Sequence, residues 1–282
     1  MDFKDHARAK ALTKIVGLLA AAALMAYAGF QARAQQPAKT TRSKIPAKPA
    51  PANSSNLPSN DIQQLLAIGR AALDQGRFEE AIRTYNRIIT LSVTQPKTAS
   101  LAHLKIGNVY MAQRKFENAV ISFQRAVTLN PSDANCYNNL GEALGELKQY
   151  PRALESFSKA VVLDPKLLKA RYNQAVTYDR MGNFRYSEFV FRNLIKSNPQ
   201  YSLPYDGLAV TLSKAGRAKE AIGFHEKAIA LDPRDPSYYY NCAISYLMMG
   251  NTAKALEQQE RLKAIDPAFA ERLASLIVKH QM

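Results

Sequence analysis

Residues 134–167 read ANCYNNLGEALGELKQYPRALESFSKAVVLDPKL, and the pattern of this segment returns at a spacing of 34 residues on either side. Five Xaa-Pro pairs keep that spacing: Asn130-Pro131, Asp164-Pro165, Asn198-Pro199, Asp232-Pro233 and Asp266-Pro267. Two series of small residues keep it as well: Gly107, Gly141, Ala175, Ala209 and Ala243, and then Ala119, Ala153, Ser187, Ala221 and Ala255. A fixed period of this length indicates a solenoid, in which each unit buries its apolar face against its neighbours.

Each unit is predicted to be a pair of antiparallel helices. Two sets of residues in the quoted segment have the three- and four-residue spacing of a helix face: Tyr137, Leu140, Gly141 and Leu144, and then Ala153, Phe157 and Ala160. The second helix should end at Asp164, because the residue before a proline is disfavoured in helical dihedrals. Gly141 and Ala153 are small because the two helices cross there, and larger side chains would separate their axes.

The breaks between the paired helices follow the same period. Glycine stands at four of them, as Gly76, Gly182, Gly216 and Gly250, because a left-handed helix end costs glycine little. Arg114 and Lys148 stand at the other two. The first unit begins near Ile62, and its step to the second unit is 38 residues in place of 34. We expect the extra residues, around 91–97, to lengthen one turn.

On these residues the chain resembles the tetratricopeptide repeat (TPR) family from about residue 62 to residue 268. The resemblance implies an all-α, right-handed solenoid of about six helical hairpins over residues 61–267. The departures are His103 and Arg171, where the family often has an aromatic residue, and His225 and Gln259, where it has Phe or Tyr. Residues 268–282 carry an apolar stripe and are predicted to form a capping helix, which solenoids need at their ends. A docking helix for a partner is the alternative.

The N-terminus has the features of a secretory signal peptide over residues 1–34. Basic residues precede an uncharged run, residues 15–30, and a small-x-small sequence predicts cleavage after Ala34. The run is shorter than the roughly 20 residues that span a bilayer. Residues 35–60 are rich in Pro, Ala, Ser and Lys and are predicted to be a disordered linker. The mature chain is therefore expected in the periplasm or outside the cell, with an inner-membrane anchor as the alternative.

Composition and spacing point away from catalysis, metals and nucleic acid. Of the formal charge of +15, residues 1–34 hold +3, residues 35–60 hold +4 and residues 61–282 hold +8, with no Arg/Lys run or base-stacking motif. No two histidines share a metal-ligand spacing, and His103 and His225 fall on packing positions. No phosphate loop or nucleophile motif occurs. We therefore expect a protein that is not an enzyme, has no cofactor and no nucleic-acid partner, and meets a membrane only if its N-terminal segment is uncleaved.

The two cysteines, Cys136 and Cys242, are predicted to be free, mostly buried thiols. An exported protein with two cysteines invites a disulfide. These two lie three units apart, however, and a disulfide needs Cα atoms within about 7 Å.

The first helix of each hairpin should line the inner surface of the solenoid. The candidate partner-binding residues on these helices are Asn108, Asn139, Lys169, Tyr172, Asn173, Tyr240 and Asn241. Asn139, Asn173 and Asn241 are equivalent, with Gly207 interrupting the row. An amide donates and accepts, so such a row can hold an extended peptide backbone, as in peptide-binding TPR proteins. Alternatively, these are solvated helix residues, and Tyr172 and Tyr240 are groove lining and not anchors.

A more specific binding site is implied only by the resemblance to the TPR family. Some TPR domains clamp a C-terminal carboxylate, and Asn108, Asn139 and Lys169 match three of their five binding positions. Leu104 and Asn173 replace the required Lys and Arg, which removes most of the charge-assisted bonding. The sequence thus predicts an exported, non-catalytic scaffold that binds a peptide segment or helix of an envelope protein, in secretion, pilus or cell-wall assembly. The alternatives are an anchored spacer and an accessory subunit of an envelope enzyme complex.

Overall fold

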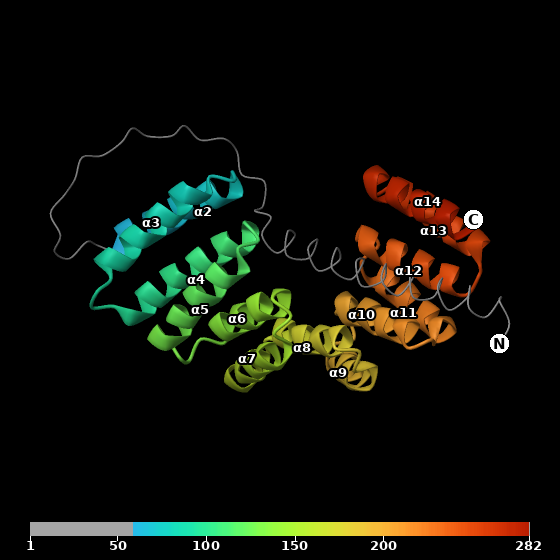
Figure 1. Ribbon diagram of the computed structural model, residues 1–282, viewed down its shortest axis with the longest axis horizontal. Coiled ribbons are helices and arrows are strands. Elements are labelled where there is room, and N and C mark those ends of the chain that lie inside the picture. Colours follow the sequence, from blue (N-terminus) through green and yellow to red (C-terminus); the bar gives the residue numbers. More distant parts are fainter. Residues whose placement is uncertain (1–58, 282) are drawn as a thin grey trace. The chain divides into compact units, whose positions relative to one another are not determined.

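The computed structural model describes residues 59–281, and these residues form thirteen α-helices and no strand. The predicted signal peptide and residues 35–58 of the predicted linker lie outside the described residues. Six hairpins and a last helix follow one another along the chain (Figure 1): α2 (Ser59–Asp74) and α3 (Phe78–Leu91), α4 (Pro96–Ala112) and α5 (Phe116–Leu129), α6 (Ala134–Glu146) and α7 (Tyr150–Leu163), α8 (Leu168–Arg180) and α9 (Phe184–Ser197), α10 (Ser202–Lys214) and α11 (Ala218–Leu231), α12 (Pro236–Met248) and α13 (Thr252–Lys263), and α14 (Pro267–Gln281).

The described residues divide into two compact units, residues 59–177 and residues 178–281, here called the first and second units. The boundary falls within α8. In each unit, the helices of a hairpin pack on one another, and each hairpin packs on the next along the chain. The first helices of successive hairpins also touch, α4 with α6 in the first unit and α10 with α12 in the second. The predicted all-α solenoid of helical hairpins is therefore confirmed.

The breaks within the hairpins have the left-handed backbone that the sequence predicts. Gly76, Gly182, Gly216 and Gly250 have φ between 70° and 82°, and Arg114 and Lys148 have φ of 58° and 59°. The second helices end before each Xaa-Pro pair, as α7 does at Leu163 before Asp164-Pro165. The helix boundaries thus follow from residues whose backbone preferences are strong.

Two helices have bounds that differ from the expected ones. α2 begins at Ser59, two residues inside the predicted linker, and Asp61 in its first turn suits the positive end of the helix dipole. The four extra residues of the first step lengthen a helix and not a turn, because α4 has 17 residues where α6 has 13. Pro96 is the first residue of α4. Proline suits this position, because a backbone N–H in the first turn of a helix has no partner within the helix.

The small residues leave room for an aromatic ring between paired helices. A Cβ atom added to Gly141 would lie 2.6 Å from Cε1 of Phe157, and one added to Gly107 would lie 2.3 Å from Cε1 of Phe123. Phe123 and Phe157 are buried, at 0% and 2% exposure. The predicted role of the small residues at the helix crossing is therefore confirmed.

We expect Gly141→Ala to lower the free energy of unfolding by about 1–2 kcal/mol, because the ring of Phe157 must shift within a packed core. The gain of up to about 1 kcal/mol in helix propensity offsets only part of that cost. Urea denaturation followed by circular dichroism measures the change. Gly223→Ala is the matched control, since Gly223 lies within α11 with no atom within 4 Å of its added Cβ. The control should be stabilised slightly, and equal losses in both variants would contradict the packing argument.

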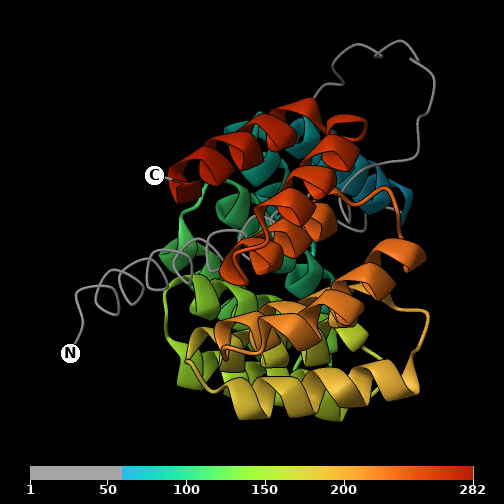
Figure 2. The same cartoon turned by 90° about the vertical axis from the view of Figure 1, so that its right-hand side faces the viewer.

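The last helix closes the second unit. α14 packs on α12 and α13 (Figure 1 and Figure 2), and Phe269, Leu273 and Ile277 join the buried cluster that contains Tyr240 and Ile244. The predicted capping helix is therefore confirmed. None of the helices within residues 59–281 combines the length and apolar character that a membrane crossing needs.

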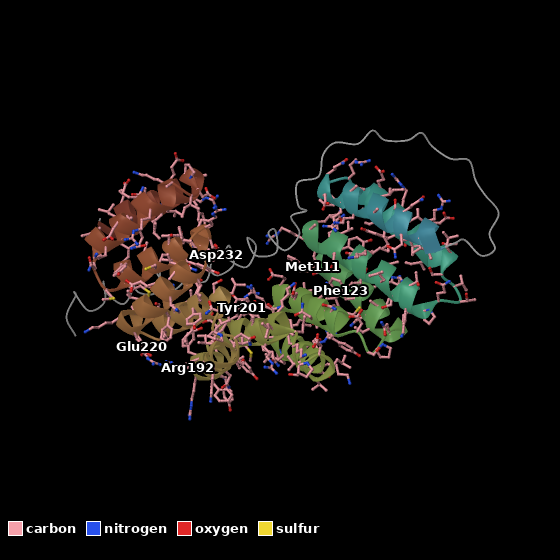
Figure 3. All side chains as sticks on the ribbon, turned by 180° about the vertical axis from the view of Figure 1, so that it is seen from behind. Met111, Phe123, Arg192, Tyr201, Glu220 and Asp232 are labelled. Atoms are coloured by element: carbon pink, nitrogen blue, oxygen red, sulfur yellow. The ribbon has the colours of Figure 1, made fainter. Side chains whose placement is uncertain are left out.

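Helices α9 and α11 of the second unit are joined by ion pairs. Arg192 on α9 bonds both Glu188 and Glu220, at 2.8 and 2.9 Å, and Arg217 bonds the same two carboxylates. Figure 3 shows Arg192 and Glu220 close together on neighbouring helices. These hydrogen-bonded pairs hold the pKa of Glu188 below its usual value, although its partial burial acts in the opposite direction.

Candidate functional site

Five of the seven predicted binding residues lie in the first unit, on the first helices of successive hairpins. Asn108 is on α4, Asn139 on α6, and Lys169, Tyr172 and Asn173 on α8. Tyr240 and Asn241 lie on α12 in the second unit. The predicted residues therefore form two groups.

Amide side chains in the first unit form a continuous hydrogen-bonded ladder across three helices. Asn139 Nδ2 donates to Asn108 Oδ1 at 3.0 Å, and Asn138 Nδ2 donates to Asn139 Oδ1 at 3.2 Å. Asn173 Nδ2 then donates to Asn138 Oδ1 at 3.0 Å. These hydrogen bonds fix the orientation of each amide. The amide N–H and C=O groups that make no bond within the ladder therefore also point in fixed directions.

Glu142 is the centre of this ladder, and the sequence did not single it out as a binding residue. Its Oε1 accepts from Asn138 Nδ2 at 2.6 Å and from Asn173 Nδ2 at 3.0 Å, and it pairs with Lys169 Nζ at 2.8 Å. The Glu142 side chain is 4% exposed. A charge this buried needs partners, and three donors converge on it. The only sequence signal was its four-residue spacing from Asn138.

Lys169 forms an ion pair with Glu142, and this pairing weakens the case for a carboxylate clamp. The clamp already lacked two cations, at Leu104 and Asn173. Since Glu142 neutralises Lys169 as well, the three matching positions bring no uncompensated positive charge to a ligand carboxylate. The geometry favours neutral amide recognition over carboxylate capture.

The ladder leaves one acceptor without a partner. Asn173 Oδ1 accepts no hydrogen bond from the described residues, and the residue is 2% exposed. Asn108 and Asn139 are partly exposed, whereas Tyr172 is 7% exposed. A buried amide oxygen without a donor is costly, and a ligand does not reach this atom in the present arrangement. The partly exposed amides of Asn108 and Asn139 are the ladder groups that a ligand can reach.

The second unit repeats part of this arrangement. Asn241 Nδ2 donates to Asp206 Oδ2 at 2.8 Å, and Asn241 Oδ1 also lacks a donor among the described residues. Tyr240 stacks on Phe269 of the capping helix, with ring centroids 4.8 Å apart. Tyr240 is 4% exposed and so holds α14 in place.

Gly207 interrupts the asparagine row for a steric reason. A Cβ atom added there would lie 2.5 Å from Cζ of Phe191, a ring that is 1% exposed. An asparagine at this position would collide with the core of the second unit. The gap in the row is therefore a packing requirement and says nothing about a ligand.

A second polar cluster, also missed from the sequence, has the connectivity of a hydrolytic triad. His225 Nδ1 lies 2.7 Å from Asp206 Oδ1, and His225 Nε2 lies 3.0 Å from Ser245 Oγ. Ser245 Oγ is also 2.7 Å from Ser213 Oγ. His225 and Ser245 are 0% exposed, enclosed by α10, α11 and α12, so a substrate does not reach the hydroxyl in this arrangement. His225 occupies the place of Phe157 two repeats earlier, and its prediction as a core residue is confirmed.

Within residues 59–281, the cysteines form no disulfide and the metal-ligating side chains form no metal cluster. Cys136 and Cys242 are free and buried, as predicted, and burial raises the pKa of each thiol to about 12. Over residues 59–281, no three His, Cys, Asp or Glu side chains are grouped as a metal site would require.

Comparisons with known proteins agree with this architecture. A family model described as TPR repeat matches residues 107–148, and three described as Tetratricopeptide repeat match residues 65–101, 134–167 and 212–279. No curated protein sequence matches the chain.

Solved structures with similar folds are repeat proteins. A tetratricopeptide repeat protein from Parabacteroides merdae is 21% identical with a TM-score of 0.65, covering 79% of this chain and 88% of that one. PilW, a type IV pilus biogenesis factor, is 21% identical with a TM-score of 0.64, covering 78% and 100%. A TPR protein of Thermus thermophilus is 23% identical with a TM-score of 0.57, covering 64% and 100%. At such identities the likeness concerns the fold.

Proposed function

Because the chain belongs to the tetratricopeptide repeat family, whose fold serves as a protein-interaction scaffold, we propose that it binds an extended peptide segment of a protein partner along the amide ladder of the first unit. The observation that carries the proposal is the pair of partly exposed amides at one end of the ladder, Asn108 and Asn139. Asn108 Nδ2 makes no hydrogen bond within residues 59–281, and Asn139 Nδ2 uses only one of its two N–H groups, in its bond to Asn108 Oδ1. A peptide main chain supplies one N–H and one C=O per residue.

The ladder favours recognition of a backbone over recognition of a charged end. Its one carboxylate and one ammonium neutralise each other, and the rest of the ladder consists of amides. Amides bond a main chain without reading its sequence, so specificity would come from side chains beside the peptide. The scaffold is non-catalytic in this proposal, because the Ser245–His225–Asp206 cluster is enclosed.

The partner is proposed to be an envelope protein. Residues 1–34 read as an export signal, and the solved structures of similar fold include a type IV pilus biogenesis factor. A role in secretion, pilus or cell-wall assembly is in keeping with both. An anchored spacer and an accessory subunit of an envelope enzyme complex are the competing functions, and neither requires the open groups on the ladder.

The test is capture of envelope proteins by the tagged chain, identified by mass spectrometry, with the variant Asn108→Ala/Asn139→Ala beside the wild type. We expect the double variant to lose roughly tenfold to thirtyfold in affinity for the captured protein, because two hydrogen bonds of about 1 kcal/mol each are removed. Purified captured protein and biolayer interferometry provide the measurement.

Asn193→Ala is the matched control, because Asn193 is an exposed amide on α9 away from the ladder. Circular dichroism must show the same helix content in all variants. Unchanged affinity in a folded double variant would place the site elsewhere, on the convex face or the capping helix. Capture of nothing by the wild type would favour the spacer.

A further inference from the structure

A pocket of about 280 Å³ opens in the first unit between α3, α4 and α5. Its polar lining consists of Asn86 from α3, His103 and Tyr110 from α4, and Asn118, Ser122 and Arg125 from α5. His103, Ile106 and Tyr110 recur at three and four residues along α4, and Asn108 of the amide ladder falls on a different face of that helix. The pocket is therefore separate from the ladder.

The charge of this pocket is positive and uncompensated. No acidic side chain lines it, and none of the ion pairs among residues 59–281 involves Arg125. The titratable groups that face His103 are Tyr110 from α4 and Arg125 from α5, while α3 presents Ile82 and Asn86. Burial lowers the pKa of His103, and the nearby Arg125 guanidinium lowers it further. The free pocket thus holds a neutral imidazole beside a guanidinium.

The equivalent pocket one repeat later has different chemistry. On α6 and α7, Tyr137 stands where α4 has His103, and Lys159 stands where α5 has Arg125. Glu155 stands where α5 has Ile121, so the lining of that larger pocket, about 620 Å³, includes an acid. The combination of two cation-forming side chains without an acid is therefore a property of the α3–α4–α5 pocket and not of the repeat.

We propose that this pocket binds a tetrahedral oxyanion, sulfate or phosphate, either free or as the end group of a larger ligand, and that His103 takes up a proton from solvent on binding. Arg125 and protonated His103 would supply two positive charges, and the amides of Asn86 and Asn118 would supply neutral donors. These donors come from three helices, an arrangement that suits an anion with oxygens in several directions better than a planar carboxylate.

The sign of the pH dependence follows from the proton uptake. A bound anion stabilises the imidazolium, so it raises the pKa of His103. By linkage, the affinity for the anion increases as the pH falls through that pKa and is lost as the pH rises above it. Sulfate is the useful probe, because it keeps its charge of −2 over the whole range from about pH 5 to pH 8.

The experiment follows the imidazole resonances of the full chain by NMR, in sulfate and in chloride at equal ionic strength, with His103→Gln assigning the signal. We expect sulfate to raise the pKa of His103 by at least about one unit and, by linkage, to bind about fivefold more tightly at pH 5.5 than at pH 8. Arg125→Gln should raise the pKa of His103 in chloride, because the repulsion is gone, and should abolish the response to sulfate. Lys159→Gln, at the equivalent position one repeat later, should leave both unchanged.

Two outcomes would overturn the proposal: equal pKa values in sulfate and chloride, or a sulfate response that survives Arg125→Gln. Two further arms separate the sources of the oxyanion. Inorganic phosphate should compete with sulfate, and vesicles of phosphatidylglycerol should broaden the His103 signal only if the pocket accepts a lipid headgroup. The proposal stands apart from peptide capture, since Asn139→Ala should not alter the sulfate response.

Discussion

Lys214→Met is expected to lower the free energy of unfolding of the second unit by about 3–5 kcal/mol, because it leaves a buried carboxylate without its cation. Lys214 on α10 bonds Asp179 at the end of α8, and their side chains are 6% and 7% exposed. Thr211 Oγ1 donates to Asp179 Oδ1 at 3.2 Å, and Thr211 lies 3.0 Å from Ser187 on α9. Without Lys214, one hydroxyl is the only remaining donor shown for that carboxylate.

Urea denaturation monitored by circular dichroism measures the loss, and two variants make the reason specific. Lys214→Met/Asp179→Asn removes both charges, so it should recover most of the lost stability, and the double-mutant cycle should show strong coupling. Lys263→Met removes one partner of an exposed pair with Glu260, whose side chains are 52% and 64% exposed. That control should cost less than about 0.5 kcal/mol. Equal losses for Lys214→Met and Lys263→Met would contradict burial as the cause.

Asp206→Ala is expected to cost about 2–5 kcal/mol, because it leaves two buried donors unpaired. The carboxylate accepts from Asn241 Nδ2 at 2.8 Å and lies 2.7 Å from His225 Nδ1. The denaturation midpoint of the second unit reports the loss. Asp206→Asn keeps one acceptor and the side-chain volume, so its loss should be smaller.

A compensated variant separates a packing role from a catalytic one. Three repeats earlier, Leu104, Phe123 and Ala143 stand at the positions of Asp206, His225 and Ser245 and belong to one buried apolar cluster. The triple variant Asp206→Leu/His225→Phe/Ser245→Ala therefore copies an apolar solution already present in the chain. It should recover much of the stability that Asp206→Ala loses. A fluorophosphonate probe should leave Ser245 unlabelled in the folded wild type. Labelling of Ser245, with loss of labelling in His225→Phe, would show that the cluster is catalytic.

The sequence predicted helix ends and helix crossings correctly where they depend on the backbone or the size of a single residue. Gly76 and Gly182 end helices because their backbone enters the left-handed region, and Asp164-Pro165 ends α7 because proline restricts the residue before it. Gly141 is small because Phe157 needs its space, and the 34-residue spacing of such positions was sufficient to predict the hairpins. These effects are local, so one sequence contains them.

The site was less predictable, because its residues act in pairs from different hairpins. The sequence identifies Asn139 and Asn173 as candidates, but it does not identify Glu142, which joins Asn173 to Lys169. From the sequence, His225 is a departure from the family pattern at a packing position. Its partners Asp206 and Ser245 are 19 and 20 residues away, and no sequence rule links polar residues at that distance.

The sequence by itself determined the repeat, the helix ends and the crossing points, since each depends on the conformational limits or volume of single residues at a fixed period. Only the tertiary structure decided which polar side chains are satisfied and which keep an open group. That outcome depends on hydrogen-bond distances between helices: Glu142 neutralises Lys169, Phe191 excludes a side chain at position 207, and Asn173 Oδ1 is left without a donor. Pairing of this kind is a property of neighbours in space, and a period along the chain does not specify it.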